Sequence, residues 1–186
     1  MTQAVDWSAL EAAIPAQLRD PAGHWFGLTM RARIVCASKE RVGRDATSYE
    51  ELADPKWKGK LCMRSGRHVY NTSLFATLIA HNGEAATEAW LRGVKANLAH
   101  KPAGGDREQA RDIYSGKCDI ALGNTSTWRC GQEREEPGAA SLGQGHPPAV
   151  WGRLKPDALP LENIANFRKK ACELVDKVNF DVGPSS

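Results

Sequence analysis

The sequence predicts an α/β domain in which a mainly parallel sheet is flanked by helices. Short apolar runs of the kind found in buried strands alternate with longer stretches of helical periodicity, and this alternation is typical of α/β layers. The chain has 186 residues, of which 41% are hydrophobic. It is therefore long enough to form one domain with a substantial core.

The first third of the chain predicts a helix, a strand and a short helix. Within residues 7–18 apolar side chains recur at every fourth position, and Pro21 follows, so we expect a helix that ends before that proline. Residues 32–37 form an apolar run that predicts a buried strand. Ser48 can cap a short helix, and Glu51, three residues later, completes a capping box.

The middle of the chain predicts two strands separated by three helices. Residues 60–63 and 118–122 read as short buried strands. Between them, helical patterns cover residues 72–81, 84–97 and 107–114. Strands joined through helices are usually parallel, and ligands of such sheets bind beyond the carboxyl ends of the strands. This rule selects the segments that follow the two strands, residues 64–70 and 124–128.

The composition changes after residue 128, which gives the expected domain organisation. Residues 129–149 are rich in glycine and proline and almost free of large apolar side chains, so we expect a loop or linker there. Residues 161–180 regain a helical pattern with one apolar face. We therefore expect an α/β domain over 1–128, a loop over 129–149 and a C-terminal helical segment over 150–186 that packs on the domain.

Composition and charge exclude several classes of function. The formal net charge is +3 and the basic residues are scattered, which does not favour a nucleic-acid partner. No apolar run approaches the ~18 residues of a membrane helix, and no signal peptide is visible at the start of this sequence. No nucleophile–base pair or paired carboxylate motif stands out, so we do not expect an enzyme.

The five cysteines are widely spaced and form no CxxC motif, so a structural zinc site is not expected. Cys62 and Cys118 each lie in a predicted strand of the same sheet. Neighbouring strands could bring their sulfur atoms within bonding distance, and two buried thiols are an equally good interpretation. The spacing leaves both alternatives open.

The strongest chemical cluster is the segment 64–73, which includes Arg64, Arg67, His68 and Tyr70. It lies where a loop enters a helix, and a helix N-terminus favours anions. A tyrosine phenolate is a hard ligand that suits Fe(III). The alternative is that Tyr70 is a packed ring and His68 a surface side chain.

Several segments resemble the periplasmic ferric-iron-binding proteins of ABC transporters. The most specific are Asp-Pro-Lys-Trp-Lys-Gly at residues 54–59 and the motif Arg-Ser-Gly-x-His-x-Tyr-Asn at residues 64–71, and the matching segments occur in family order. The resemblance implies the second lobe of a periplasmic-binding-protein type II-like fold, with the first lobe missing, as in a truncated relative. It also implies a periplasmic location and an ABC transporter permease as partner.

In this family Fe(III) is held by tyrosine phenolates, often with a carbonate anion. The resemblance carries the metal-ligand role to Tyr70 and the anion-binding role to Arg31. Two further tyrosines are expected after the Asn124-Thr125 pair, but Ser126 and Thr127 stand there. Serine and threonine hydroxyls are poor substitutes for phenolates, and the first lobe is missing. For both reasons we expect iron(III) binding that is weakened.

The resemblance leaves a second hypothesis open. A lobe without its companion would expose the apolar face between lobes, and large exposed apolar patches are commonly interfaces. The chain could then be a protein-interaction or structural module without metal binding, and it could self-associate through that face.

Overall fold

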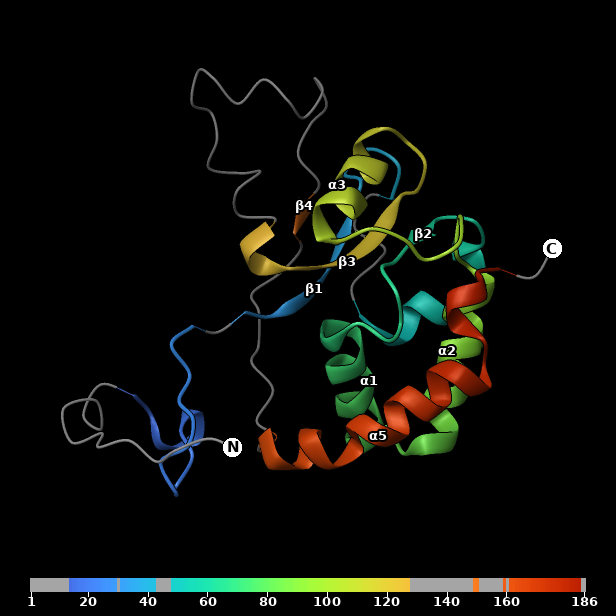
Figure 1. The fold of residues 1–186 in the computed structure, drawn as a ribbon. Helices are drawn as coiled ribbons and strands as arrows, with labels where there is room; N and C mark the ends of the chain where they lie inside the picture. Colours follow the sequence, from blue (N-terminus) through green and yellow to red (C-terminus); the bar gives the residue numbers. More distant parts are fainter. Residues whose placement is uncertain are drawn as a thin grey trace, which may run out of the picture. The chain divides into compact units, whose positions relative to one another are not determined.

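The computed structural model describes residues 14–29, 31–42, 48–127, 149–150, 159 and 161–184 (Figure 1). The chain divides into two compact units, residues 1–31 and residues 32–186. In the described part of the first unit, Ala16–Leu18 form a 3-10 turn, and Arg19 pairs with Phe26 in an isolated antiparallel bridge. Most of the helix predicted for 7–18 lies outside the described residues.

The second unit contains a four-stranded sheet in the order β2-β3-β1-β4. Its strands are β1 (Arg33–Ala37), β2 (Leu61–Cys62), β3 (Ile120–Asn124) and β4 (Ala149–Val150). The first three correspond to the predicted strands. β2 and β3 are parallel, whereas β1 runs antiparallel to both of its neighbours, β3 and β4.

The α/β class is therefore confirmed, but the expectation of a mainly parallel sheet is corrected, since two of its three strand pairs are antiparallel. The connections explain why. Three helices lie between β2 and β3, and a connection through helices returns the chain in the same direction. The described part of the connection from β1 to β2 holds the 3-10 turns Glu50–Ala53 and Pro55–Trp57, and short turns of this kind do not impose a parallel direction.

The helices of the second unit are α1 (Val69–Asn82), α2 (Glu84–Ala96), α3 (Asp106–Tyr114) and α5 (Leu161–Lys177). α1 begins three residues before the predicted start because the ring of His68 caps it: His68 Nδ1 accepts a hydrogen bond from the Tyr70 amide at 3.2 Å. It ends at Gly83, whose φ of 83° suits a residue without Cβ.

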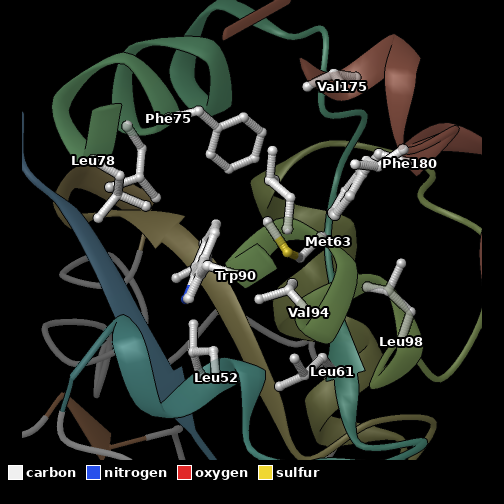
Figure 2. Packing of buried hydrophobic residues seen from close by; sticks show 14 of the residues in the cluster. Leu52, Leu61, Met63, Phe75, Leu78, Trp90, Val94, Leu98, Val175 and Phe180 are labelled. Atoms are coloured by element: carbon white, nitrogen blue, oxygen red, sulfur yellow. The ribbon is translucent and has the colours of Figure 1, made fainter. Parts of the chain in front are cut away.

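The main core lies between α1, α2, α5 and one face of the sheet (Figures 1 and 2). Phe75 lies at its centre, with ring centroids 5.8 Å from Trp90 and 6.0 Å from Phe180. α5 contributes Ala171, Leu174 and Val175 to the same core, and Val178, which follows it directly, is also part of that core. The C-terminal helix therefore belongs to the same packed unit as the strands and helices that precede it.

A smaller apolar cluster lies on the other face of the sheet. Side chains of β1 alternate, so that Ala37 joins the main core while Ile34 and Cys36 join this second cluster. Cys62 and Cys118 are also part of it and form a disulfide, with their Cα atoms 5.8 Å apart. Of the two alternatives that the spacing left open, the structure contains the disulfide.

Among the described residues, the helices are too short or too polar for any of them to cross a bilayer.

Replacing Phe180 with alanine should show that the C-terminal segment stabilises the whole unit. The ring is fully buried against Phe75, so Phe180→Ala should lower the free energy of unfolding in urea by about 3–5 kcal/mol. The matched control is Val182→Ala, two residues later, because Val182 is 69% exposed; it should change stability by less than about 0.5 kcal/mol. Equal effects of the two substitutions would contradict this packing.

Candidate functional site

The candidate site is centred on Tyr70, in the first turn of α1. Its ring is half-buried and packs edge-on against His68, with centroids 4.7 Å apart. Two guanidinium groups lie near the ring: Arg64 Cζ is 5.1 Å and Arg33 Cζ is 5.9 Å from its centroid. The phenol is therefore not sealed in the hydrophobic interior, and it lies in positively charged surroundings.

Strand ends bring these residues together. β2 and β3 are parallel and paired in register, so their carboxyl ends meet at one edge of the sheet. Arg64 follows β2 by two residues, and Asn124 is the last residue of β3. Arg33 begins the antiparallel strand β1 and lies directly opposite Asn124. The prediction that the segments after these strands form one site is consistent with this register.

A single carboxylate holds the two arginines in place. Arg33 donates from Nη1 to both oxygens of Asp106 at 2.8 Å, and Arg64 donates from Nη1 to Oδ1 at 3.1 Å. The amide of Asn124 donates to Asp106 Oδ2 at 2.9 Å. All three ionic side chains are largely buried: 8% of Arg33, 14% of Arg64 and 6% of Asp106 is exposed.

Charge and burial act in opposite directions on Asp106. Burial raises the pKa of this carboxyl, but the hydrogen bonds and charge of Arg33 and the amide of Asn124 outweigh burial, so the pKa lies below its usual value. The carboxylate is therefore ionised near neutral pH. Two guanidinium groups face one carboxylate, which leaves one net positive charge beside Tyr70.

Two asparagines fix the orientation of Arg33 and of the loop. Arg33 donates from Nη2 to Asn71 Oδ1 at 2.9 Å and from Nη1 to Asn124 Oδ1 at 3.2 Å. The Nδ2 group of Asn71 donates to the carbonyls of Arg64 and Ser65 at 3.0 and 3.2 Å. Asn71 thus connects the buried arginine to the loop that leads into α1.

The C-terminal 3-10 turn, Phe180–Val182, holds the other side of this loop. Asp181 accepts hydrogen bonds from Ser65 Oγ and from the Gly66 amide, both at 2.7 Å. A Cβ at Gly66 would lie 2.9 Å from the Phe180 ring, so only glycine fits without a shift. The glycine of the Arg-Ser-Gly motif therefore allows close packing of the loop on the C-terminal turn.

Two buried donors at the site have no protein partner. Nε of Arg33 and Nε of Arg64 are both buried without a hydrogen bond.

His68 accepts at Nδ1 from the Tyr70 amide, so its neutral ring carries the proton on Nε2. Burial and the charge of Arg64 lower the pKa of His68, which favours this neutral form. These N–H groups are the donors that an anion needs.

The other predicted site residues have different positions. Arg31 is exposed and is the last residue of the first unit, whereas Arg33, two residues later, lies beside Tyr70 in the second. Ser126 is exposed and Thr127 half-buried, in the helical turn that follows β3. Their hydroxyls stand directly after the strand end that carries Asn124. The assigned roles of Arg31, Ser126 and Thr127 stay predictions.

Sequence reasoning missed the ionic centre of the site. In the sequence Asp106 is an acidic residue at a helix start after Gly104-Gly105. The sequence leaves a solvated or a salt-bridged role open for Arg33 without indicating a partner, and the structure has the salt bridge, to Asp106. The sequence did point to Asn71, because this residue is part of the Tyr-Asn motif. For Asp106 the available signal was its place between two predicted strands whose ends were both expected at the site.

A family profile described as bacterial extracellular solute-binding protein matches residues 1–117. Iron uptake protein A1 of Synechocystis is 41% identical over 143 residues, which are 76% of this chain and 40% of that protein. A Bordetella ferric binding protein of known structure is 37% identical, with a TM-score of 0.82 over 97% of this chain and 77% of that one.

The apo ferric ion-binding protein A of Pasteurella haemolytica is 35% identical, with a TM-score of 0.84 over 97% of this chain and 77% of that one. These structures confirm the expected periplasmic-binding-protein type II-like fold. The chain spans only 40% of the length of the Synechocystis protein. Because the family profile covers more than half of the chain, the chain belongs to the family of bacterial extracellular solute-binding proteins.

Proposed function

We propose that this chain binds ferric iron as the solute-binding component of an ABC-type iron uptake system, with Tyr70 as a metal ligand. The observation that carries the proposal is the position of Tyr70, half-buried at the strand ends with Arg33 and Arg64 beside its ring. The names of the relatives support iron as the cargo. A permease partner and a periplasmic location follow from the same relationship.

The chemistry of the donors supports Fe(III) together with an anion. Fe(III) takes the place of the phenolic proton of Tyr70, and the resulting phenolate is a hard oxygen donor. A bound anion such as carbonate would compensate the net positive charge that Arg33, Arg64 and Asp106 leave at the site. The donors that we propose for this anion are the orphaned Nε groups of both arginines and the Nε2–H of His68. Arg31 is proposed as a further anion contact on the resemblance alone.

The proposed affinity is weak. Tyr70 supplies one phenolate, and Ser126 and Thr127 stand where the family has tyrosines. Hydroxyls of serine and threonine remain protonated near neutral pH and donate little charge to a metal. Exogenous ligands such as carbonate or citrate would therefore complete the coordination sphere. If no iron binds, the interaction or structural module becomes the better account.

Loading with Fe(III)-citrate and bicarbonate should give a visible phenolate-to-iron charge-transfer band, and Tyr70→Phe should abolish it. The physical reason is that the band requires a phenolate oxygen bound to the metal. The matched control is Tyr114→Phe, since Tyr114 belongs to α3 and has no role in the proposal; this variant should keep the band. A colourless wild-type protein after loading would refute iron binding.

Changing Asp106 to asparagine should lower the stability of the fold, because the two arginines of the site share this single carboxylate. Removing one member of a buried ion pair costs about 3–5 kcal/mol, so Asp106→Asn should unfold at much lower urea concentration at pH 7. The pKa of Asp106 is lowered in the folded state, so its ion pairs stabilise the fold above the unfolded carboxyl pKa of about 3.9. That stability is lost as the pH falls through the folded pKa.

The variant should therefore lose less stability than the wild type when the pH falls from 5 to 3. The control is Asp176→Asn, whose partner Arg67 is 66% exposed, and which should cost less than about 1 kcal/mol. Parallel pH profiles for wild type and Asp106→Asn would contradict the assignment.

A further inference from the structure

A second group of donor atoms lies around the disulfide. Cys62 Sγ, a ring nitrogen of His100 and a carboxylate oxygen of Asp112 all lie within 4.8 Å of one another. Cys118 Sγ is bonded to Cys62 Sγ and so lies next to this group of three donors. Cys62 comes from β2, His100 from the segment after α2, Asp112 from α3 and Cys118 from the segment before β3. We name these four residues the disulfide–histidine cluster.

The hydrogen bonding of His100 prepares it as a metal ligand. Nδ1 lies 2.9 Å from the carbonyl oxygen of Lys101, which can only accept, so Nδ1 carries a proton. In the neutral ring Nε2 then carries a lone pair and no proton. Histidines that bind metals commonly donate their other N–H to a backbone carbonyl in this way.

The lone pair of His100 faces another acceptor. Nε2 lies 3.3 Å from Asp112 Oδ2 and is buried without a hydrogen-bond partner. Two acceptors at this distance require either a proton or a cation between them. Asp112 Oδ1 is occupied separately by Lys117 Nζ at 3.3 Å, so Oδ2 is the oxygen left for the histidine side.

The cluster is held in place by the backbone and remains accessible. Asp112 O accepts from the amides of Lys117 and Cys118 at 2.9 and 3.4 Å, which fixes Cys118 beside the end of α3. The sulfur atoms are buried, whereas His100 is 33% and Asp112 17% exposed. An ion could therefore enter on the side of the imidazole and carboxylate.

We propose that opening the Cys62–Cys118 disulfide creates a site for a borderline-soft divalent cation such as Zn²⁺. The four ligands are the thiolates of Cys62 and Cys118, Nε2 of His100 and Oδ2 of Asp112. Two thiolates, one imidazole and one carboxylate in a tetrahedral set suit Zn²⁺. A dithiol supplies two electrons to the disulfide and becomes a disulfide itself, and the cation then displaces the two thiol protons.

This site is chemically distinct from the one at Tyr70. A phenolate with anion-binding arginines suits a hard trivalent ion, whereas thiolates select softer cations. The disulfide and the metal exclude each other, because both use the same sulfur atoms. The oxidation state of the cysteine pair thus decides whether this second site exists.

The test uses the full chain with the other cysteines removed, as Cys36→Ala, Cys130→Ser and Cys172→Ser. The protein is reduced with a dithiol, separated from it under argon and titrated with Co²⁺ and then Zn²⁺. The reduced protein should bind one Co²⁺ with thiolate-to-cobalt charge-transfer and tetrahedral visible bands, and Zn²⁺ should displace it. The oxidised protein should show none of these bands.

His100→Gln and Asp112→Asn should each weaken Zn²⁺ binding by at least about tenfold, which is the minimum that loss of a supporting partner costs at metal sites. The controls are His24→Gln, at a histidine that pairs with Asp20 in the first unit, and Tyr70→Phe. Both variants should leave Zn²⁺ binding unchanged. Equal binding by oxidised and reduced protein, or unaltered binding by His100→Gln, would overturn the proposal.

If reduction itself unfolds the chain, circular dichroism recorded before metal is added will show the loss of helical signal. Zn²⁺ should then restore the folded spectrum in the wild type but not in a His100→Gln/Asp112→Asn double variant. If Zn²⁺ refolded both the wild type and the double variant, or neither of them, the proposed site would be contradicted.

Discussion

The organisation of the Tyr70 site depends on one buried carboxylate. Asp106 accepts from Arg33, from Arg64 and from the amide of Asn124, so it joins β1, β3, the segment after β2 and the start of α3. Without it, two guanidinium groups would face each other in a largely buried environment, which is unfavourable. The net positive charge that surrounds Tyr70 is thus a consequence of how the strands are held together.

The same strand ends connect stability to the proposed function. Arg33 reaches Asn71, Asn71 holds the carbonyls of Arg64 and Ser65, and Asp181 holds the opposite side of the loop. The side chains that pack the C-terminal turn therefore also position the loop that carries Tyr70 into α1. A substitution in the core beneath this loop should affect ligand binding even where it contacts no ligand.

The sequence predicted those features that depend on local periodicity and missed those that depend on partners distant in sequence. β1 and β3 were predicted because apolar runs identify buried strands, and α1 because its end at Asn82-Gly83 is a local signal. The antiparallel direction of β1 depends on which strand it pairs with, and no local pattern encodes that. The link between Arg33 and Asp106 joins residues 73 positions apart, so neither residue alone indicated it.

We propose that Tyr70, set among these arginines, provides an oxygen ligand to ferric iron in the presence of an anion. Resonance Raman spectroscopy of the iron-loaded chain, excited within its visible band, tests this most directly. Iron bound through Tyr70 should give enhanced tyrosinate ring vibrations that depend on added bicarbonate. Iron bound to the protein without tyrosinate vibrations would contradict it, because the metal would then be held by other groups.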